Sequence, residues 1–372
     1  MGTIIIRLED EELWGSLKHH SQKLYSRYSK LYPRHEVFFW SNNFNNSEAN
    51  FFEFLKQFNV ERVICLDSQI PIAEIVKILN LRPPDVELII HGYGDFIRQL
   101  PRLKPHLLKS SNCYNLKFYF PSTKLCSAFK KIFKTNRGVY LYPLHYTQLT
   151  TAPRETFLLP NHFTEVKAGY AGRLEESKNL IETITLLIQA DFFDKGSFYL
   201  AGALETHIYH FGQKHKDSDY LNLLIKFLKT LDRKVKDKIH FVGDLNESEL
   251  CAFFKQLDIV INLSTFYGES YGISPRQSID LGVPILVSDW GGFSDIKKQA
   301  GVACLKVNTK KTGVKRFDSQ IFKKCLYRLV HLKKAKKEIK GCTQISSPVK
   351  VKSFCVKSIN VPDEKTWNNL MS

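Results

Sequence analysis

Short runs of β-branched and aromatic residues alternate with helix-like segments along most of the chain. These runs fall into two series of six. The first series predicts strands at 3–8, 36–40, 62–66, 87–91, 116–120 and 139–143, and the second at 166–172, 197–202, 238–243, 258–264, 284–288 and 301–307. Several runs are apolar throughout, as is typical of strands covered on both faces. The alternation therefore predicts an α/β protein with doubly wound parallel sheets.

Helical patterns fill the intervals between these strands. Helices are predicted at 12–31, 49–58, 71–80, 124–134, 179–189, 219–233, 247–256, 274–281 and 318–333. After about residue 334 the pattern fades into a basic segment, in which a short final helix is an option.

The two series are separated by a loop-like, proline-bearing stretch at 144–165. We therefore expect one domain over 1–155, a second over 156–340, and a basic tail over 341–372. Packing of this tail against the first domain is one option. Ligands of such domains bind at the carboxyl ends of the strands, so a cleft between the two domains is expected.

The chain is strongly basic, with a formal net charge of +17. Residues 96–154 contain eleven Lys or Arg and no Asp or Glu. Such a surface favours polyanions, although a solvated lysine-rich surface accounts for it equally well. No nucleic-acid motif is recognised, so nucleic acid is not an expected partner. Residues 96–134 hold two amphipathic pieces, 96–110 and 124–134, which suit an anionic membrane surface or, alternatively, a core-facing helix with exposed lysines.

Other sequence signals point to a cytoplasmic protein. The eight cysteines form no C-x-x-C pair, and the N-terminus lacks a secretory pattern. No stretch reaches the ~20 apolar residues of a membrane span. We expect reduced thiols, no metal site and a cytoplasmic location, with peripheral attachment to the inner face of the membrane as an option.

The stretch AGYAGRLEESKN, at 168–179, has the residue types of a phosphate site. Arg173 and Lys178 follow a strand end at Gly172 and lie around a helix start. Cations and backbone amides in that position can bind phosphate oxygens. An ordinary helix start with surface charges, in which Glu175 and Glu176 pair with Lys178 or nearby lysines, is the alternative.

A second stretch, GESYGISPRQ at 268–277, has complementary chemistry. Glu269 precedes Gly272 and a predicted helix. The carboxylate could accept hydrogen bonds from sugar hydroxyls, while the amides at the helix start could hold a phosphate. An ordinary strand-to-helix turn is again the alternative.

Taken together, these blocks resemble the second domain of the retaining family 4 glycosyltransferases (glycosyl transferases group 1). The matching blocks are Gly172-Arg173-Leu174 with Lys178-Asn179, Phe241-Val242-Gly243, Glu269-Ser270-Tyr271-Gly272-Ile273, Gly282-Val283-Pro284-Ile285, Ser288-Asp289 and Gly291-Gly292. Several blocks in order over about 120 residues are more specific than any single motif. The resemblance implies the GT-B fold, with two Rossmann-like domains facing a cleft.

The resemblance also implies roles for individual residues. Arg173 and Lys178 would neutralise the donor diphosphate and Glu269 would bind the donor sugar, which makes these residues catalytic. His91 would lie near the donor sugar, with a structural hydrogen bond as the alternative. The remaining donor-binding residues would be Gly172, Gly202, Gly243, Tyr271, Gly272, Ile273 and Gln277. Fixed cations would stabilise the charge that develops on the departing diphosphate, so no metal and no cofactor are expected.

Two departures from the family pattern stand out. The family has a second acid where this chain has Gln277, and a glutamine keeps one acceptor oxygen for the ribose but carries no charge. A glycine-rich loop often follows the first strand in the family, whereas this chain has LEDEELWGSL, in which Gly15 is the one glycine.

The sequence therefore predicts a metal-independent, hexosyltransferase-type enzyme. It would move a sugar from a UDP- or GDP-linked donor to a hydroxyl acceptor with retention. By family habit, the acceptor would be a glycan or a lipid-linked glycan in the synthesis of surface polysaccharide or lipopolysaccharide. A non-catalytic GT-B-like binding or scaffold protein is the alternative, motivated by the two departures.

Overall fold

The computed structural model describes most of the chain, which folds into two compact units. The described residues are 2–8, 15–40, 47–67, 70–79, 86–93, 96, 99, 101–105, 115–134, 138–142, 159, 165–202, 207–210, 213–216, 218–266, 268–309 and 315–341. The first unit comprises Met1–Tyr146 with His210–Gln213, and the second comprises Thr147–Tyr209 with Lys214–Ser372. The predicted domain boundary at 155/156 and the predicted tail beyond 341 lie outside the described residues.

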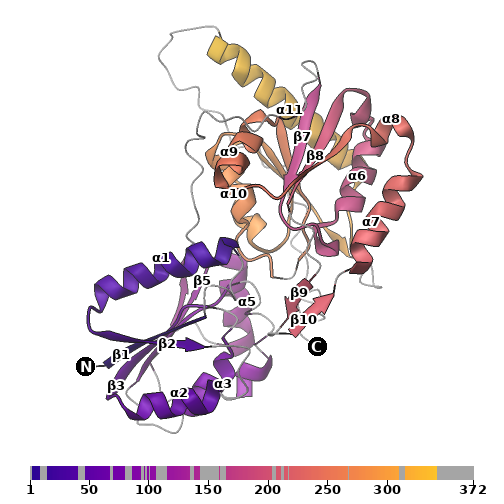
Figure 1. The fold of residues 1–372 in the computed structure, drawn as a ribbon. Coiled ribbons are helices and arrows are strands. Elements are labelled where there is room, and N and C mark those ends of the chain that lie inside the picture. The colour runs from indigo at the N-terminus through magenta and orange to yellow at the C-terminus, as the bar shows by residue number, and fades with distance from the viewer. Residues whose placement is uncertain are drawn as a thin grey trace. The chain divides into compact units, whose positions relative to one another are not determined.

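The first unit is built on one six-stranded parallel sheet in the order β2-β1-β3-β4-β5-β6. Its elements are β1 (Gly2–Leu8), α1 (Gly15–Leu31), β2 (His35–Trp40), α2 (Ser47–Lys56), β3 (Val60–Cys65), α3 (Ile72–Leu79), β4 (Glu87–His91), β5 (Asn115–Phe120), α5 (Thr123–Phe133) and β6 (Val139–Leu141). Figure 1 shows α1 on one side of this sheet and α2 with α3 on the other.

The amphipathic piece at 124–134 forms most of α5 and uses its apolar side in the core of the first unit. Leu125 and Phe129 are buried, and the Phe129 ring lies 4.4 Å from that of Phe118 on β5. The core-facing alternative therefore accounts for this helix, and contact with a membrane stays a prediction. The other piece, 96–110, is described only in part.

The second unit repeats the plan with strand order β11-β8-β7-β12-β13-β14, and every adjacent pair is parallel. Its main elements are β7 (Val166–Ala171), η2 (Glu176–Lys178), α6 (Leu180–Gln189), η3 (Phe192–Asp194), β8 (Gly196–Ala201), α7 (Ser218–Thr230), α8 (Arg233–Lys236), β11 (Ile239–Gly243), α9 (Glu247–Gln256), β12 (Ile259–Asn262), α10 (Ile273–Asp280), β13 (Ile285–Ser288), η4 (Gly291–Asp295), β14 (Val302–Leu305) and α11 (Ser319–Gly341). Two short hairpin-like pairs, β9 (His207–His210) with β10 (Gln213–Lys216) and β15 (Asn308–Thr309) with β16 (Lys315–Arg316), were not predicted.

Both faces of the second sheet are buried, which explains its continuous apolar strands. Alternate residues of β8 enter different cores: Phe198 and Leu200 pack with α6, α7 and α11, whereas Tyr199 and Ala201 pack with α9. In Figure 1, α6 and α7 correspondingly lie on the opposite side of the sheet from α9 and α10. This arrangement confirms the predicted α/β class with two doubly wound parallel sheets.

The predicted elements match the structure closely, and the largest difference is the length of the last helix. Each of the twelve predicted strands and nine predicted helices has a counterpart within a few residues. Helix α11 continues to Gly341, beyond the predicted end at residue 333 and into the segment where a short final helix was an option. Its last turns, rich in lysine with Ala335 and Glu338, lack an apolar stripe but consist of good helix formers.

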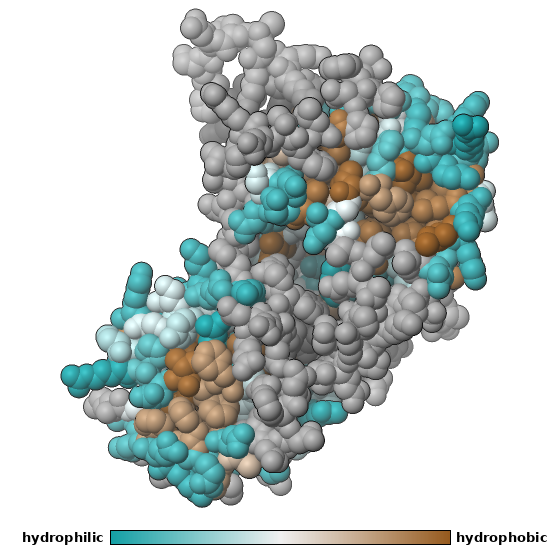
Figure 2. All heavy atoms as spheres, viewed as in Figure 1, coloured by the Kyte–Doolittle hydropathy of each residue, from teal (hydrophilic) through white to brown (hydrophobic). Residues whose placement is uncertain are grey.

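The described surface is mixed in polarity, and hydrophobic residues are visible among hydrophilic ones on both units in Figure 2. The exposed large apolar side chains come from six different elements: Leu31, Phe39, Tyr140, Leu141, Leu223, Ile225, Phe241 and Ile321. Within the part of the chain that the structure describes, no helix has the length and apolar character needed to cross a membrane.

Candidate functional site

The candidate site lies where the strand order of the second sheet reverses. Strands β7 and β12 are neighbours. After β7 the chain continues to β8 and β11 at one edge of the sheet, and after β12 it continues to β13 and β14 at the other edge. Ligands of open α/β sheets bind at the carboxyl ends of strands at such a reversal. The loop after β7 contains the predicted residues Arg173 and Lys178, and the loop after β12 contains Glu269.

Backbone and amide hydrogen bonds hold these two loops together. The Thr265 amide donates to the Ser177 carbonyl over 2.8 Å. The side-chain amide of Asn179 donates to the carbonyl oxygen of Leu263 and to the hydroxyl oxygen of Thr265, at 2.7 and 2.9 Å. These bonds join segments more than eighty residues apart and fix the spacing of the charged side chains that the loops carry.

The predicted charged residues converge into one cluster. The Lys178 Nζ lies 3.0 Å from Glu269 Oε2, so this ion pair joins the two loops. The Arg173 guanidinium lies 3.2 Å from Glu175 Oε2, and Lys178 Nζ lies 3.8 Å from the other oxygen of Glu175. Lys178 also donates to Ser264 Oγ at 3.3 Å. The structure thus brings together the three residues assigned to the diphosphate and the sugar.

An aromatic ring lies next to both cations. The Phe266 ring centre is 5.4 Å from the Arg173 guanidinium carbon and 5.0 Å from Lys178 Nζ. Both distances are within the range of cation–π attraction. The ring also restricts the conformations of the two side chains. The loss of side-chain conformational entropy when an anion binds is therefore smaller.

Three glycines end adjacent strands beside this cluster. The Gly172 amide donates to the Ala201 carbonyl, and the Gly202 amide donates to the Gly243 carbonyl over 2.7 Å. Gly202 has a φ of +140°, and a Cβ there would lie 1.9 Å from the carbonyl oxygen of Gly172. These strand ends can approach so closely because residue 202 has no side chain.

The Glu269 loop is positioned by the segment after β13. The Gly292 amide donates to the Glu269 carbonyl over 2.7 Å, and a Cβ at Gly291 would lie 2.0 Å from that same oxygen. The indole of Trp290 donates to the Phe266 carbonyl over 2.8 Å, and the Ser288 hydroxyl donates to the Ser264 carbonyl. The Gly291-Gly292 pair is therefore a support for the carboxylate loop.

The N-terminus of α10 faces the same strand ends. Gly272 is the N-cap of this helix, and the Ser274 hydroxyl donates to the carbonyl of Ala171 at the end of β7 over 2.8 Å. Tyr271 is buried, and the Arg276 guanidinium lies 3.8 Å from its ring centre and donates to its carbonyl. Burial raises the pKa of the Tyr271 hydroxyl, although the charge of Arg276 opposes the shift. The hydroxyl therefore stays neutral.

Gln277 is buried on α10, with 7 % of its surface exposed. A buried carboxylate would need a charged or strongly donating partner, whereas a neutral amide avoids most of that desolvation cost. The glutamine is therefore compatible with its burial in the ligand-free protein.

Tyr170, on β7, supports the loop that carries Arg173. Its hydroxyl donates to the Arg173 carbonyl over 2.7 Å. Burial raises the pKa of Tyr170 well above its ordinary value, and the negative charges of Glu175 and Glu269 add to the shift. The phenol therefore stays protonated and keeps its hydrogen bond across the ordinary pH range.

His91 lies in the first unit, at the end of β4, and its contacts there are aromatic. Its Nε2 is 2.9 Å from the Tyr28 hydroxyl, and its ring stacks on Tyr119 at 5.2 Å. Tyr142 approaches edge-on, and only 2 % of His91 is exposed. These contacts match the alternative of a histidine that makes a structural hydrogen bond. The predicted role of His91 beside the donor sugar stays a prediction.

Sequence reasoning missed several members of the cluster. The sequence predicts Glu175 only as a surface charge that pairs with Lys178, whereas it is 3 % exposed and contacts Arg173 as well as Lys178. Phe266 and Ser264 were not singled out, although they directly follow an apolar strand that ends beside the Glu269 loop. Their position directly after this strand could have identified them, because residues at the carboxyl end of a strand at the reversal point are expected to line the site.

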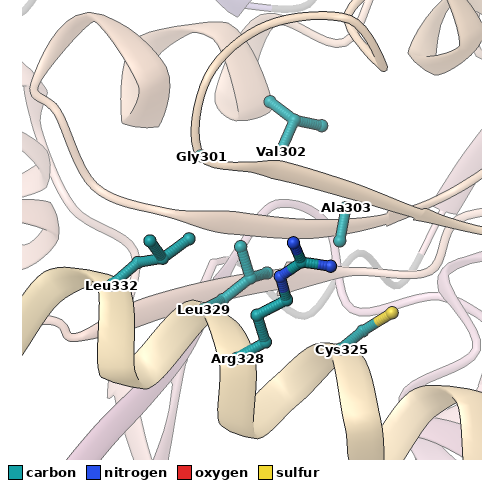
Figure 3. Close-up of a pocket in the computed structure, with 7 residues that line it drawn as sticks. All are labelled: Gly301, Val302, Ala303, Cys325, Arg328, Leu329 and Leu332. Atoms are coloured by element: carbon teal, nitrogen blue, oxygen red, sulfur yellow. The ribbon is translucent and has the colours of Figure 1, made fainter. Parts of the chain in front are cut away.

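Among the described residues there is no group of three His, Cys, Asp or Glu side chains that could hold a metal ion. A separate pocket lies between β14 and α11, away from the charged cluster (Figure 3). It is lined by Gly301, Val302, Ala303, Cys325, Arg328, Leu329 and Leu332. It shares no residue with the predicted site.

The sequence of this second unit matches a known family. Residues 161–321 match the family model of the glycosyl transferases group 1. The matched segment contains every charged residue of the cluster and both supporting glycines. No curated protein sequence matches the chain significantly.

Solved structures with the same fold cover nearly the whole chain. Anabaena HepE in complex with UDP-glucose is 13% identical, covers 92% of this chain and 91% of its own, and gives a TM-score of 0.60. A glycosyltransferase from Rickettsia africae ESF-5 is 12% identical, with coverages of 91% and 92% and a TM-score of 0.61. The lipopolysaccharide outer core galactosyltransferase WaaB is 13% identical, with coverages of 89% and 90% and a TM-score of 0.59. The chain therefore has the GT-B fold, with two Rossmann-like units.

Proposed function

We propose that this protein is a glycosyltransferase that moves a sugar from a nucleotide-diphosphate sugar to a hydroxyl acceptor. The observation that carries the proposal is the cluster of Arg173, Lys178 and Glu269 at the reversal point of the second sheet. Two cations and an acid, held by loops that are themselves joined by hydrogen bonds, match the two ends of a sugar diphosphate. The family match over 161–321 and the HepE complexes with UDP and UDP-glucose support the same donor class.

In this proposal, each residue acts on one part of the donor. Arg173 and Lys178 bind the diphosphate and stabilise the negative charge that develops as the glycosidic bond to the phosphate breaks. Oε2 of Glu269 is bonded to Lys178, and its other oxygen accepts a hydrogen bond from a hydroxyl of the donor sugar. Binding the sugar and its leaving group from one rigid cluster fixes the anomeric carbon for attack by the acceptor.

The remaining predicted residues complete the donor site. The backbone amides at Tyr271, Gly272 and Ile273 hold the distal phosphate at the start of α10. Gly172, Gly202 and Gly243 allow the backbone of the strand ends to approach the donor closely, and Gln277 accepts a hydrogen bond from the ribose. His91 would contact the donor sugar from the first unit.

The finer features of the reaction belong to the same proposal. Transfer proceeds with retention, the sugar is a hexose, the donor is linked to UDP or GDP, and the two side-chain cations stand in for a metal ion. The acceptor is a surface polysaccharide, lipopolysaccharide or lipid-linked glycan, reached in the cytoplasm or at the inner face of the membrane. The basic residues of 96–134 would then attract the anionic lipid surface.

The test is thermal-shift binding of UDP, GDP, ADP and CMP to the wild type and to Arg173→Ala. At one hundred times its dissociation constant, a ligand adds about 2.7 kcal/mol to the free energy of unfolding, which is readily detected. We expect one diphosphate to stabilise the wild type and to lose this effect in Arg173→Ala. Arg233→Ala, which removes an arginine with 91 % of its side chain exposed, is the matched control and should bind like the wild type. No shift with any nucleotide would contradict the proposal.

A non-catalytic binding protein is the second candidate, and Gln277 is the observation that favours it. The two candidates differ in turnover rather than in binding. Once a binding nucleotide is identified, its sugar conjugates are offered with glycan acceptors, and release of the free nucleoside diphosphate is measured. Binding without release in both the wild type and Gln277→Glu would favour the scaffold, whereas release by the wild type would exclude it.

A further inference from the structure

The donor cluster contains a buried acid that the proposed reaction does not use. Glu175 is 3 % exposed and accepts a hydrogen bond from the Ser177 hydroxyl over 2.7 Å. Its oxygens lie 3.2 Å from the Arg173 guanidinium and 3.8 Å from Lys178 Nζ. Glu175 therefore contacts both cations that the donor diphosphate needs.

Helix capping does not explain this carboxylate. Glu175 occupies the N-cap position of the short helix η2, but its side chain makes no capping hydrogen bond. Both of its oxygens are directed to the cations and to the Ser177 hydroxyl instead. The side chain is therefore part of the charged cluster rather than of the helix start.

The cluster is formally neutral in the ligand-free protein. Arg173 and Lys178 contribute two positive charges, and Glu175 and Glu269 contribute two negative ones. Glu269 has an assigned use, because a carboxylate can accept hydrogen bonds from sugar hydroxyls. Glu175 has none, and its charge has the same sign as the diphosphate. Like charges placed close together in a partly desolvated site oppose binding.

We propose that Glu175 is a positioning residue that sets how tightly the site holds a nucleoside diphosphate. It keeps Arg173 and Lys178 in place while the site is empty, and it competes with the diphosphate for them when the site is occupied. The competition weakens binding of the product and so speeds its release. This inference rests on the proposed function, since the product is the nucleoside diphosphate that leaves the donor.

The test compares Glu175→Gln with Glu176→Gln in the full-length protein. Glutamine keeps an acceptor for Ser177 and removes only the charge. Glu176 is the matched control, because it is the next residue in the chain, carries the same charge and is exposed. Affinities for UDP and for inorganic pyrophosphate are measured by calorimetry. We expect Glu175→Gln to bind both about five-fold to ten-fold more tightly than Glu176→Gln does.

Steady-state kinetics provides a readout that simple damage to the site would not produce. If product release limits turnover, Glu175→Gln should lower both KM for the donor and kcat, whereas a distorted site raises KM. Combining Glu175→Gln with Arg173→Ala should abolish most of the gain in affinity, because one of the freed cations is then absent. Equal or weaker binding by Glu175→Gln, with its melting temperature unchanged, would overturn the inference.

The probes separate this inference from the proposed function. Pyrophosphate needs only the two cations, whereas UDP needs the whole donor site. If Glu175→Gln gains affinity for pyrophosphate but no variant binds any nucleotide, the proposed donor fails while the competition by Glu175 stands. If the wild type binds UDP and Glu175→Gln gains affinity for neither probe, the donor site stands and the inference fails.

Discussion

Replacing Gly202 with alanine should both destabilise the second unit and disturb the diphosphate loop. A Cβ at this position would lie 1.9 Å from the Gly172 carbonyl oxygen, and real Cβ contacts are essentially never shorter than 3.0 Å. The ends of β7 and β8 must therefore move apart by about 1 Å in an otherwise close-packed region. Because Gly172 directly precedes Arg173, this movement displaces a cation of the cluster.

The expected cost has two parts. The φ of +140° at residue 202 is unfavourable for alanine by about 1 kcal/mol. The clash with Gly172 adds the cost of overpacking, roughly 1–3 kcal/mol. Gly202→Ala should therefore lower the free energy of unfolding by about 2–4 kcal/mol.

Gly243→Ala is the matched comparison, since Gly243 also ends a strand and has a φ of +82°, but a Cβ there meets nothing within 4 Å. It should cost only the conformational part, about 1 kcal/mol. Urea denaturation gives the two free energies of unfolding, and calorimetry with UDP gives the two affinities. Gly202→Ala should lose more stability and more affinity for UDP than Gly243→Ala. Equal losses in the two variants would refute the reasoning that the contact with Gly172 sets the position of the loop.

Three further predictions address other parts of the structure. Lys178→Met should lower the free energy of unfolding by about 2 kcal/mol, because Glu269 loses its cation and Glu175 loses one of its two, and adding Glu175→Gln should recover part of it; urea denaturation of both variants checks this, and no recovery would contradict it. Trp290→Phe removes the hydrogen bond to the Phe266 carbonyl and should cost about 1–2 kcal/mol, with weaker UDP binding by calorimetry; unchanged stability would count against that bond. Burial raises the pKa of the Asp67 carboxyl, although hydrogen bonds from the Leu8 amide and the Tyr93 hydroxyl oppose the shift. The stability that Asp67 contributes is therefore fully present below its unfolded pKa and lost as the pH rises through its folded pKa. The melting temperature of Asp67→Asn relative to wild type should therefore increase as the pH rises above about 4, and a pH-independent difference would contradict this.

The order of the elements could be predicted from the sequence, because hydrophobic patterning is a local property. Nearly continuous apolar runs such as 197–202 indicate strands buried on both faces, and the structure has β8 there with every residue buried. The difference at the end of α11 has the same origin. Residues 334–341 lack an apolar stripe, yet their helix propensity is high, so patterning alone understated the helix.

The residues of the candidate site were predicted less completely than the fold. Arg173, Lys178 and Glu269 could be named because they belong to blocks that resemble a known family. Glu175 could not be assigned, since a glutamate beside two cations at a helix start reads as a surface charge. The two cations beside it are in turn held by Phe266 and Ser264, which lie about ninety residues further along the chain.

By itself, the sequence determined which segments become strands and helices and which loops carry charge, since both follow from side-chain type and local spacing. Only the tertiary structure decided that the loops after β7 and β12 meet, that Lys178 pairs with Glu269 and that Glu175 lies between the two cations. The reason is physical: these contacts depend on the order of strands in the sheet, which is set by packing of both faces of the sheet at once. A charge acquires its role from the neighbours that this packing places around it.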